Sequence, residues 1–424
     1  MGKNRIIVIL ILFIWFVISF VTNILGPIMP AIIESYHISL TLAAFLPFSF
    51  FLAYGIMSIP AGILIEKYGG KTSMILAFSL NFIGVFSFSL FPIYGMAIAS
   101  LFVVGMGMAM LQVIINPLMR VAGGEENFAF YSIFGQGVFG LASFISPLFY
   151  VFLMGQFSEK SSTSNGLLAL RKLSPINLPW VSMYWIFSLL FIGVLILIFL
   201  LKFPSLELKE EEKSGPLKSY QDLLKDSQVW IYFLGIMAYV GTEQGLADWM
   251  SKFLKVYYGF NPENEGAHAI SWFWGTMAIG CLLGLALLKL IDAKKALKIS
   301  CIFAILCLSL ALWGSKSISL WAFPLCGFCI SLIFSLVFSL ALNSVSQYHG
   351  SFSGILCSGI FGGALIPFLI GWIGDQGGLK WGLTFLYIPL FFLFWISFWA
   401  KPLVDNKIYS WKELFSKSPE NKLI

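Results

Sequence analysis

The sequence predicts an all-α membrane protein whose twelve transmembrane helices form two pseudo-symmetric halves of six. Of its 424 residues, 59% are hydrophobic and only 11% are charged, whereas soluble domains carry roughly 25% charged residues. A membrane-spanning helix needs about 20 mostly apolar residues, so the chain is long enough for about twelve of them. A single long polar stretch near the middle divides the apolar segments into two equal groups.

Each apolar segment is long enough to cross a bilayer once. The twelve predicted spans are residues 6–33, 41–65, 72–92, 94–121, 128–155, 178–201, 229–257, 266–290, 296–314, 318–346, 352–374 and 380–400.

The polar stretch predicts the domain organisation. Residues 1–201 form the N-terminal half, 202–228 a solvated cytoplasmic linker, 229–401 the C-terminal half and 402–424 a cytoplasmic tail. With the N-terminus inside, 19 of the 26 Lys and Arg residues fall on the cytoplasmic side, as the positive-inside rule requires. This bias and the even number of spans predict a multi-pass protein with both termini cytoplasmic. The chain has no Asn-x-Ser/Thr sequon, which favours a bacterial inner membrane.

Several functional classes lack support. The net charge of +6 comes from loop lysines with no basic patch interleaved with aromatics, so we expect no nucleic-acid partner. Cys326 and Cys329 form a CxxC without a second pair or ligand histidines, so no metal is expected and the thiols are better interpreted as small packing groups. No nucleophile–base arrangement or cofactor motif predicts an enzyme.

Two acids lie well inside a predicted span, Glu243 and Asp248, and intramembrane ionisable residues are functional candidates. Asp248 precedes Lys252 by four residues, so either a structural ion pair or a coupling role is open to it. No Lys or Arg stands one turn from Glu243. Burial of such a carboxyl penalises its charged form, so it could carry a proton, bind a cation, accept a hydrogen bond from a solute, or join two helices.

Uncharged amides form the second candidate set. Gln112 and Asn116 are four residues apart and share a helix face, Asn23 lies in the first span, and Gln136 lies between two glycines in the fifth. Amides donate and accept hydrogen bonds, which suits a hydroxyl-rich solute; the alternative is that they join helices. Trp249 and Trp272 could stack on a sugar ring, although many tryptophans in membrane proteins form interface belts.

The loop after the second span carries Gly62, Glu66, Lys67 and Lys71 in the pattern Gly-x-Leu-x-Glu-Lys-x-Gly-Gly-Lys. The glycines permit a tight cytoplasmic turn, and the charges can bond neighbouring helix ends in one conformer and release them in another. We therefore expect these to be gate residues rather than solute ligands.

Four motifs together resemble the fucose–galactose–glucose:proton symporter family of the major facilitator superfamily, in its glucose/galactose branch. They are residues 54–67 with their Pro-Ala-Gly and Glu-Lys, residues 111–117 with Leu-Gln-x-x-x-Asn-Pro, residues 239–243 with Val-Gly-x-Glu, and residues 354–357 with 362–367. The resemblance implies the major facilitator fold, in which solute binds near the midplane between the halves.

The chain departs from the family pattern in its polar residues. Asn23 stands where relatives often carry an aspartate implicated in proton coupling, an arginine near Cys281 is absent, and Ile330 and Ser335 replace an asparagine and a proline. Glu243 is then the remaining acid that could couple transport to a cation.

The resemblance implies a secondary transporter that moves a small polar solute, a hexose or related polyol, by alternating access. Transport would be coupled to a proton or sodium, or be uncoupled, and the protein would be a monomer in the lipid bilayer. Two alternatives stay open: export of an amphipathic compound, and a non-transporting receptor or assembly factor on a carrier scaffold.

Overall fold

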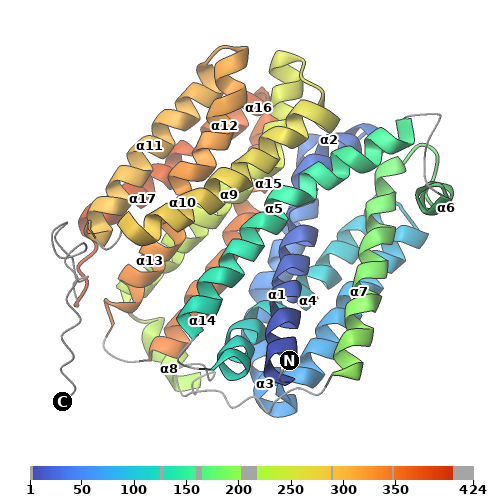
Figure 1. Cartoon of the computed structure of the whole chain (residues 1–424). Helices are drawn as coiled ribbons and strands as arrows, with labels where there is room; N and C mark the ends of the chain where they lie inside the picture. Colours follow the sequence, from blue (N-terminus) through green and yellow to red (C-terminus); the bar gives the residue numbers. More distant parts are fainter. Residues whose placement is uncertain are drawn as a thin grey trace, which may run out of the picture.

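The computed structural model describes residues 3–124, 128–158, 165–201, 217–287, 290–345 and 348–403. These parts of the chain are helices and their connections, arranged as one bundle (Figure 1). The end of the bundle where α1 begins and α17 ends is called the terminal end here, and the opposite end the far end.

The N-terminal half consists of six long helical stretches and one short surface helix. They are α1 (Lys3–Thr22) with α2 (Leu25–Tyr36), the two parts of α3 (Leu40–Leu90), α4 (Tyr94–Gly123), α5 (Phe128–Ser158), α6 (Asn165–Leu173) and α7 (Ser182–Leu200). Gly69, at φ 78°, divides α3 into two helices, a backbone conformation that glycine adopts readily. The expected tight turn after the second span is therefore confirmed.

The C-terminal half repeats this plan. It consists of α9 (Ser227–Tyr258), α10 (Ala267–Leu287), α11 (Ala293–Trp313), α12 (Lys316–Ile330) with α13 (Ile333–Leu342), α14 (His349–Ser358) with α15 (Gly362–Gly377), and α16 (Leu379–Thr384) with α17 (Tyr387–Trp399).

Helix ends follow ordinary capping chemistry. Asp226 accepts a hydrogen bond from the Gln228 amide at 2.8 Å and so begins α9, because an N-cap oxygen satisfies a backbone N–H that the helix cannot. Asp292 caps α11 in the same way. Gly259, at φ 69°, ends α9 in the left-handed conformation that favours glycine.

Twelve membrane-spanning helices are the architecture of the chain. Within the described ranges, ten helical segments are long and apolar enough to cross a membrane. The two remaining crossings are α9 and α10, of 32 and 21 residues; α9 is less apolar because it carries Glu243, Asp248, Lys252 and Lys255. The predicted all-α fold is confirmed.

Four of the spans are interrupted within the described residues, which the apolar pattern does not reveal. The first span breaks at Asn23 between α1 and α2, and the tenth at Ser331 between α12 and α13. The eleventh breaks at a 3₁₀ turn, Gly359–Phe361, and the twelfth between α16 and α17. Discontinuous helices are common around transporter binding sites.

The predicted linker contains a helix. Residues 217–223 form α8 (Leu217–Leu223), and the Ser219 hydroxyl lies 2.9 Å from that of Ser351 on α14. This part of the linker therefore packs on the bundle, and the expectation of a wholly solvated linker is wrong there. Residues 202–216 and 404–424, which hold the rest of the linker and most of the predicted tail, lie outside the described residues.

Close backbone contacts join the halves through α2–α9, α5–α10 and α3–α15, the pairs that meet along the seam (Figure 1). A Cβ on Gly26 of α2 would overlap the carbonyl oxygen of Ala247 on α9. A Cβ on Gly140 of α5 would lie 2.6 Å from that of Ala278 on α10. Small residues let membrane helices approach this closely, and here they hold the two halves together.

Candidate functional site

Glu243 lies near the middle of α9 and has uncharged partners. Its Oε1 accepts a hydrogen bond from Gln244 Nε2 at 3.3 Å, and the Tyr239 hydroxyl also bonds the carboxyl. Cys281 of α10 lies close enough to interact with the Glu243 charge. The ring centroids of Tyr239 and of Phe334 on α13 lie 5.7 Å apart. Residues of α10 and α13 therefore lie around the pair that Glu243 and Tyr239 form on α9.

Asp248 lies deeper in the protein than Glu243, with only 3% of its surface exposed. Its Oδ2 has no hydrogen-bond partner in the part of the chain that the structure describes. The expected pairing with Lys252 does not form, because Lys252 Nζ turns to Glu34 of α2 at 3.9 Å. An ionised carboxylate with an unpaired buried oxygen would carry a large desolvation cost, so the protonated form fits this environment.

Asn23 sits at the break in the first span and binds within the N-terminal half. Its Nδ2 donates to Ser143 Oγ on α5 at 2.9 Å and to Ser19 Oγ at 3.4 Å, and the two serine hydroxyls lie 2.6 Å apart. The amide thus joins the first and fifth spans in the way that polar groups join membrane helices.

The other amides occupy different environments. Gln112 is half-buried on α4 and Gln136 is exposed on α5. Asn116 lies on α4 one turn after Gln112, but its side chain is outside the described residues. The two glutamines are therefore open to a ligand in a way that Asn23 is not.

The two tryptophans differ in exposure. Trp249 is fully buried, and its Nε1 donates to the Pro367 carbonyl of α15 at 3.1 Å, so it joins two helices of one half. Trp272 is 44% exposed and packs edge-on against Phe144 of α5 at 5.4 Å. Only Trp272 offers a free ring face in this conformation.

The predicted gate loop is partly described. Lys71 Nζ donates to the carbonyl of Leu201 at 2.7 Å, at the end of α7, where a cation is favoured. Lys67 lies over the Tyr68 ring at 5.3 Å, and Gly62 lies within α3. The Glu66 side chain is outside the described residues.

A polar latch at the far end was missed in the sequence. The Asp375 carboxylate of α15 accepts hydrogen bonds from the backbone amides of Leu40 at 2.9 Å and Thr41 at 2.8 Å, which begin α3. Glu34 of α2 pairs with Lys255 of α9. These contacts join opposite halves. The signal available was an acid at the end of the eleventh span, but nothing in the sequence indicates which helix start it meets.

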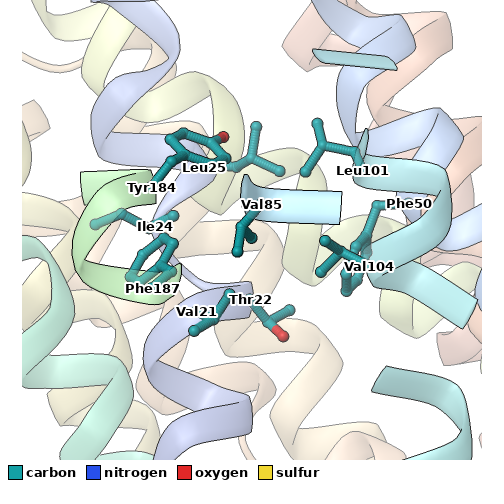
Figure 2. Close-up of a pocket in the computed structure, with 10 residues that line it drawn as sticks. All are labelled: Val21, Thr22, Ile24, Leu25, Phe50, Val85, Leu101, Val104, Tyr184 and Phe187. Atoms are coloured by element: carbon teal, nitrogen blue, oxygen red, sulfur yellow. The ribbon is translucent and has the colours of Figure 1, made fainter. Parts of the chain in front are cut away.

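A small cavity lies behind the break in the first span, inside the N-terminal half. Figure 2 shows it between Val21, Thr22, Ile24 and Leu25 and the side chains of four other spans. It holds about 10 Å³ of water-sized space, which fits about one water molecule. Its lining is almost wholly apolar (Figure 2), so this cavity is too small and too apolar for a polar solute.

The arrangement defines a polytopic carrier: two six-helix halves that meet at a seam, with broken helices and a polar carboxyl near mid-span. The profile of the Major Facilitator Superfamily matches residues 11–360, and the chain belongs to that superfamily.

Curated relatives are similar over most of the chain. A glucose/galactose transporter of Brucella abortus (strain 2308) is 28% identical over 407 residues, which cover 94% of this chain and 93% of the relative. The L-fucose-proton symporter of Escherichia coli K12 is 24% identical, over 86% of this chain and 85% of its own length. The resemblance to the fucose–galactose–glucose:proton symporters is confirmed.

Solved structures share the fold. The outward-facing structure of the fucose:proton symporter FucP aligns with a TM-score of 0.66 at 19% identity, and the alignment covers 94% of this chain and all of FucP. A bacterial homologue of the lysosomal transporter Spinster aligns with a TM-score of 0.72 at 13% identity, covering 94% of this chain and 98% of the homologue.

Proposed function

We propose that the protein is a secondary transporter that moves a hexose, or a related sugar or polyol, by alternating access. The names of the relatives, which include a glucose/galactose transporter and a fucose-proton symporter, support this solute class. The half-buried Gln112 and the exposed Gln136 offer amide groups, which both donate and accept the hydrogen bonds that sugar hydroxyls make.

The observation that carries the proposal is the environment of Glu243. It is a mid-span carboxyl whose partners are Tyr239 and Gln244, with no cation of the described residues paired to it. Such a group can take up and release a proton as its surroundings change. Asn23 occupies the position at which relatives often have an acid, and an amide bound to Ser143 cannot exchange a proton. Glu243 is therefore the first candidate for coupling.

Asp248 is the second coupling candidate. It lies beside the contact between Gly26 and Ala247, where the first and seventh spans meet. Opening of this seam would hydrate the carboxyl and favour release of its proton, while closure would favour its uptake. A sodium ion in place of the proton is the alternative for both acids.

The latch at Asp375 and Glu34 supports an outward gate that is closed in this conformation. We place the far end outside and both termini in the cytoplasm of a bacterial inner membrane, in keeping with the distribution of Lys and Arg. The loop around Gly62, Glu66, Lys67 and Lys71 then forms the opposite gate. The proposed units are residues 1–201 and 229–401, which move as two bodies in a monomer.

A ligand screen tests the solute class. Purified protein would be melted with hexoses, sugar alcohols and amphiphiles, with and without sodium. A ligand that binds only the folded protein raises the melting temperature in a saturable way. Stabilisation by a hexose is expected, and stabilisation by amphiphiles alone would instead support the exporter alternative.

A further inference from the structure

A groove opens between α10 and α12 at the far end, outside the centre of the bundle. It encloses about 280 Å³. Trp272, Trp321, Leu320 and Pro324 form its apolar part, and Glu265 and His268 lie at its rim. The two indoles are unusually accessible for such large rings, at 44% and 60% exposed, so the groove has two free aromatic faces.

The polarity of the groove changes along its length. Trp272 and Trp321 each lie five residues after the first residue of their helices, about 7–8 Å into the span. Glu265 lies just before α10, in the turn Pro262–Gly266. The groove therefore crosses the depth at which headgroups give way to hydrocarbon, where tryptophan is enriched.

An acid lines the groove and a cation lies on the same helix as its apolar wall, outside the lining. Glu265 Oε2 accepts a hydrogen bond from the backbone N–H of Asn261 at 3.1 Å, which leaves Oε1 to accept one from a ligand. Lys316 lies one helical turn before Leu320 and rests over the Phe260 ring at 4.5 Å. An ammonium group suits Glu265 and the indole faces, and a phosphate suits Lys316.

We propose that this groove binds one phospholipid with a zwitterionic, primary-amine headgroup. The ammonium lies between Glu265 and the indoles, the phosphate faces Lys316, and the upper acyl chain follows Trp272, Trp321 and Pro324 into the hydrocarbon. Trp272 also packs against Phe144 of the other half, so the lipid borders the seam where the halves meet. A soluble sugar fits the indoles but leaves the apolar floor and Lys316 unused.

Native mass spectrometry of the full chain tests the site without any transport assay. Protein in mild detergent would be incubated with equimolar phosphatidylethanolamine and phosphatidylglycerol. Wild type should retain one phosphatidylethanolamine in preference. The double variant Trp272→Leu/Trp321→Leu should lower that retention by about tenfold, and Glu265→Gln should remove the preference for the amine lipid.

Trp372→Leu is the matched control, because Trp372 is also half-exposed, on α15, but does not line the groove. It should retain the lipid as wild type does, and melting temperatures would show that each variant is folded. The proposal is overturned by equal retention of the two lipids by wild type, by undiminished retention in both groove variants, or by displacement of the lipid with glucose.

Discussion

Gln112 is a candidate solute ligand on α4, and the structure describes its side chain. It is half-buried. If it binds a solute hydroxyl, its removal leaves that hydroxyl without a hydrogen-bond partner, at a cost of about 1–3 kcal/mol. Gln112→Ala should therefore weaken solute binding with little change in expression or melting temperature. Isothermal titration with the sugar found by the screen measures this, and unchanged affinity would assign Gln112 to helix packing.

Asp248 gives a second prediction at this scale. Removing one partner of a buried ion pair costs about 3–5 kcal/mol, but among the described residues no cation pairs with Asp248 and its Oδ2 is unpaired. Asp248→Asn should therefore change the free energy of unfolding by less than about 1 kcal/mol. Denaturant unfolding in detergent measures it. A loss of several kcal/mol would show that the carboxylate is charged and paired in the native protein.

The sequence shows which residues are polar within a span but not what they touch. Glu243 and Asp248 stand out because acids are rare in apolar segments. The partner of Asn23 could not be predicted, since Ser143 lies 120 residues away and its hydroxyl resembles those of many other serines. The same holds for Asp375, whose partner Leu40 is 335 residues distant.

The far-end latch belongs to the scale of elements, because it ties the start of α3 to the end of α15. Asp375→Ala removes the hydrogen bonds to the Leu40 and Thr41 amides. In this exposed setting they contribute on the order of 1 kcal/mol, enough to shift a two-state population several-fold. Double electron–electron resonance between spin labels at positions 37 and 376 measures the distance across the far end. The variant should show a larger population at long distances than the wild type, because the far end opens more often.

Asp222→Ala is the control for that experiment. Asp222 is also a solvent-accessible acid, but its Oδ1 pairs with Lys225 Nζ three residues later, at 3.0 Å. Unlike Asp375, this ion pair does not link the two halves. Asp222→Ala should leave the distances unchanged. Identical distributions in Asp375→Ala and wild type would show that other contacts keep the far end closed.

Gly26 tests the seam itself. A Cβ there overlaps the Ala247 carbonyl oxygen, and overpacking of a tight contact costs about 1–3 kcal/mol. Gly26→Ala should lower the melting temperature, whereas Gly155→Ala, on α5 with open space around it, should not. Equal melting temperatures for the two variants would contradict the packing described for α2 and α9.

Helices were easier to predict than their interruptions. The predicted segment 229–257 agrees with α9 (Ser227–Tyr258), and 94–121 with α4 (Tyr94–Gly123), because polar turns punctuate long apolar runs. The breaks at Ser331 and Gly359–Phe361 lie inside continuous apolar runs. Tertiary contacts accompany them, such as the hydrogen bond that the Cys281 thiol donates to the Ser331 carbonyl at 3.3 Å, and periodicity cannot show such contacts.

At the scale of the whole molecule, the two halves and their contacts describe a carrier closed at the far end. The order of elements along the chain repeats one plan, with six spans, a linker and six more spans. Composition and the spacing of apolar segments were sufficient to predict that plan, since lipid leaves few alternatives to spanning helices. The identity of the solute depends on side chains at the centre, where the sequence departs from its relatives.

Uptake of sugar by proteoliposomes under an inward proton gradient tests the central claim most directly. Wild type should accumulate the sugar above its external concentration and lose this accumulation when the gradient is dissipated. Glu243→Gln should abolish gradient-driven accumulation but retain exchange of labelled for unlabelled sugar, because the amide can bond solute but cannot exchange a proton. Accumulation by Glu243→Gln at the wild-type level, or wild-type uptake indifferent to the proton gradient, would contradict a coupling role for Glu243.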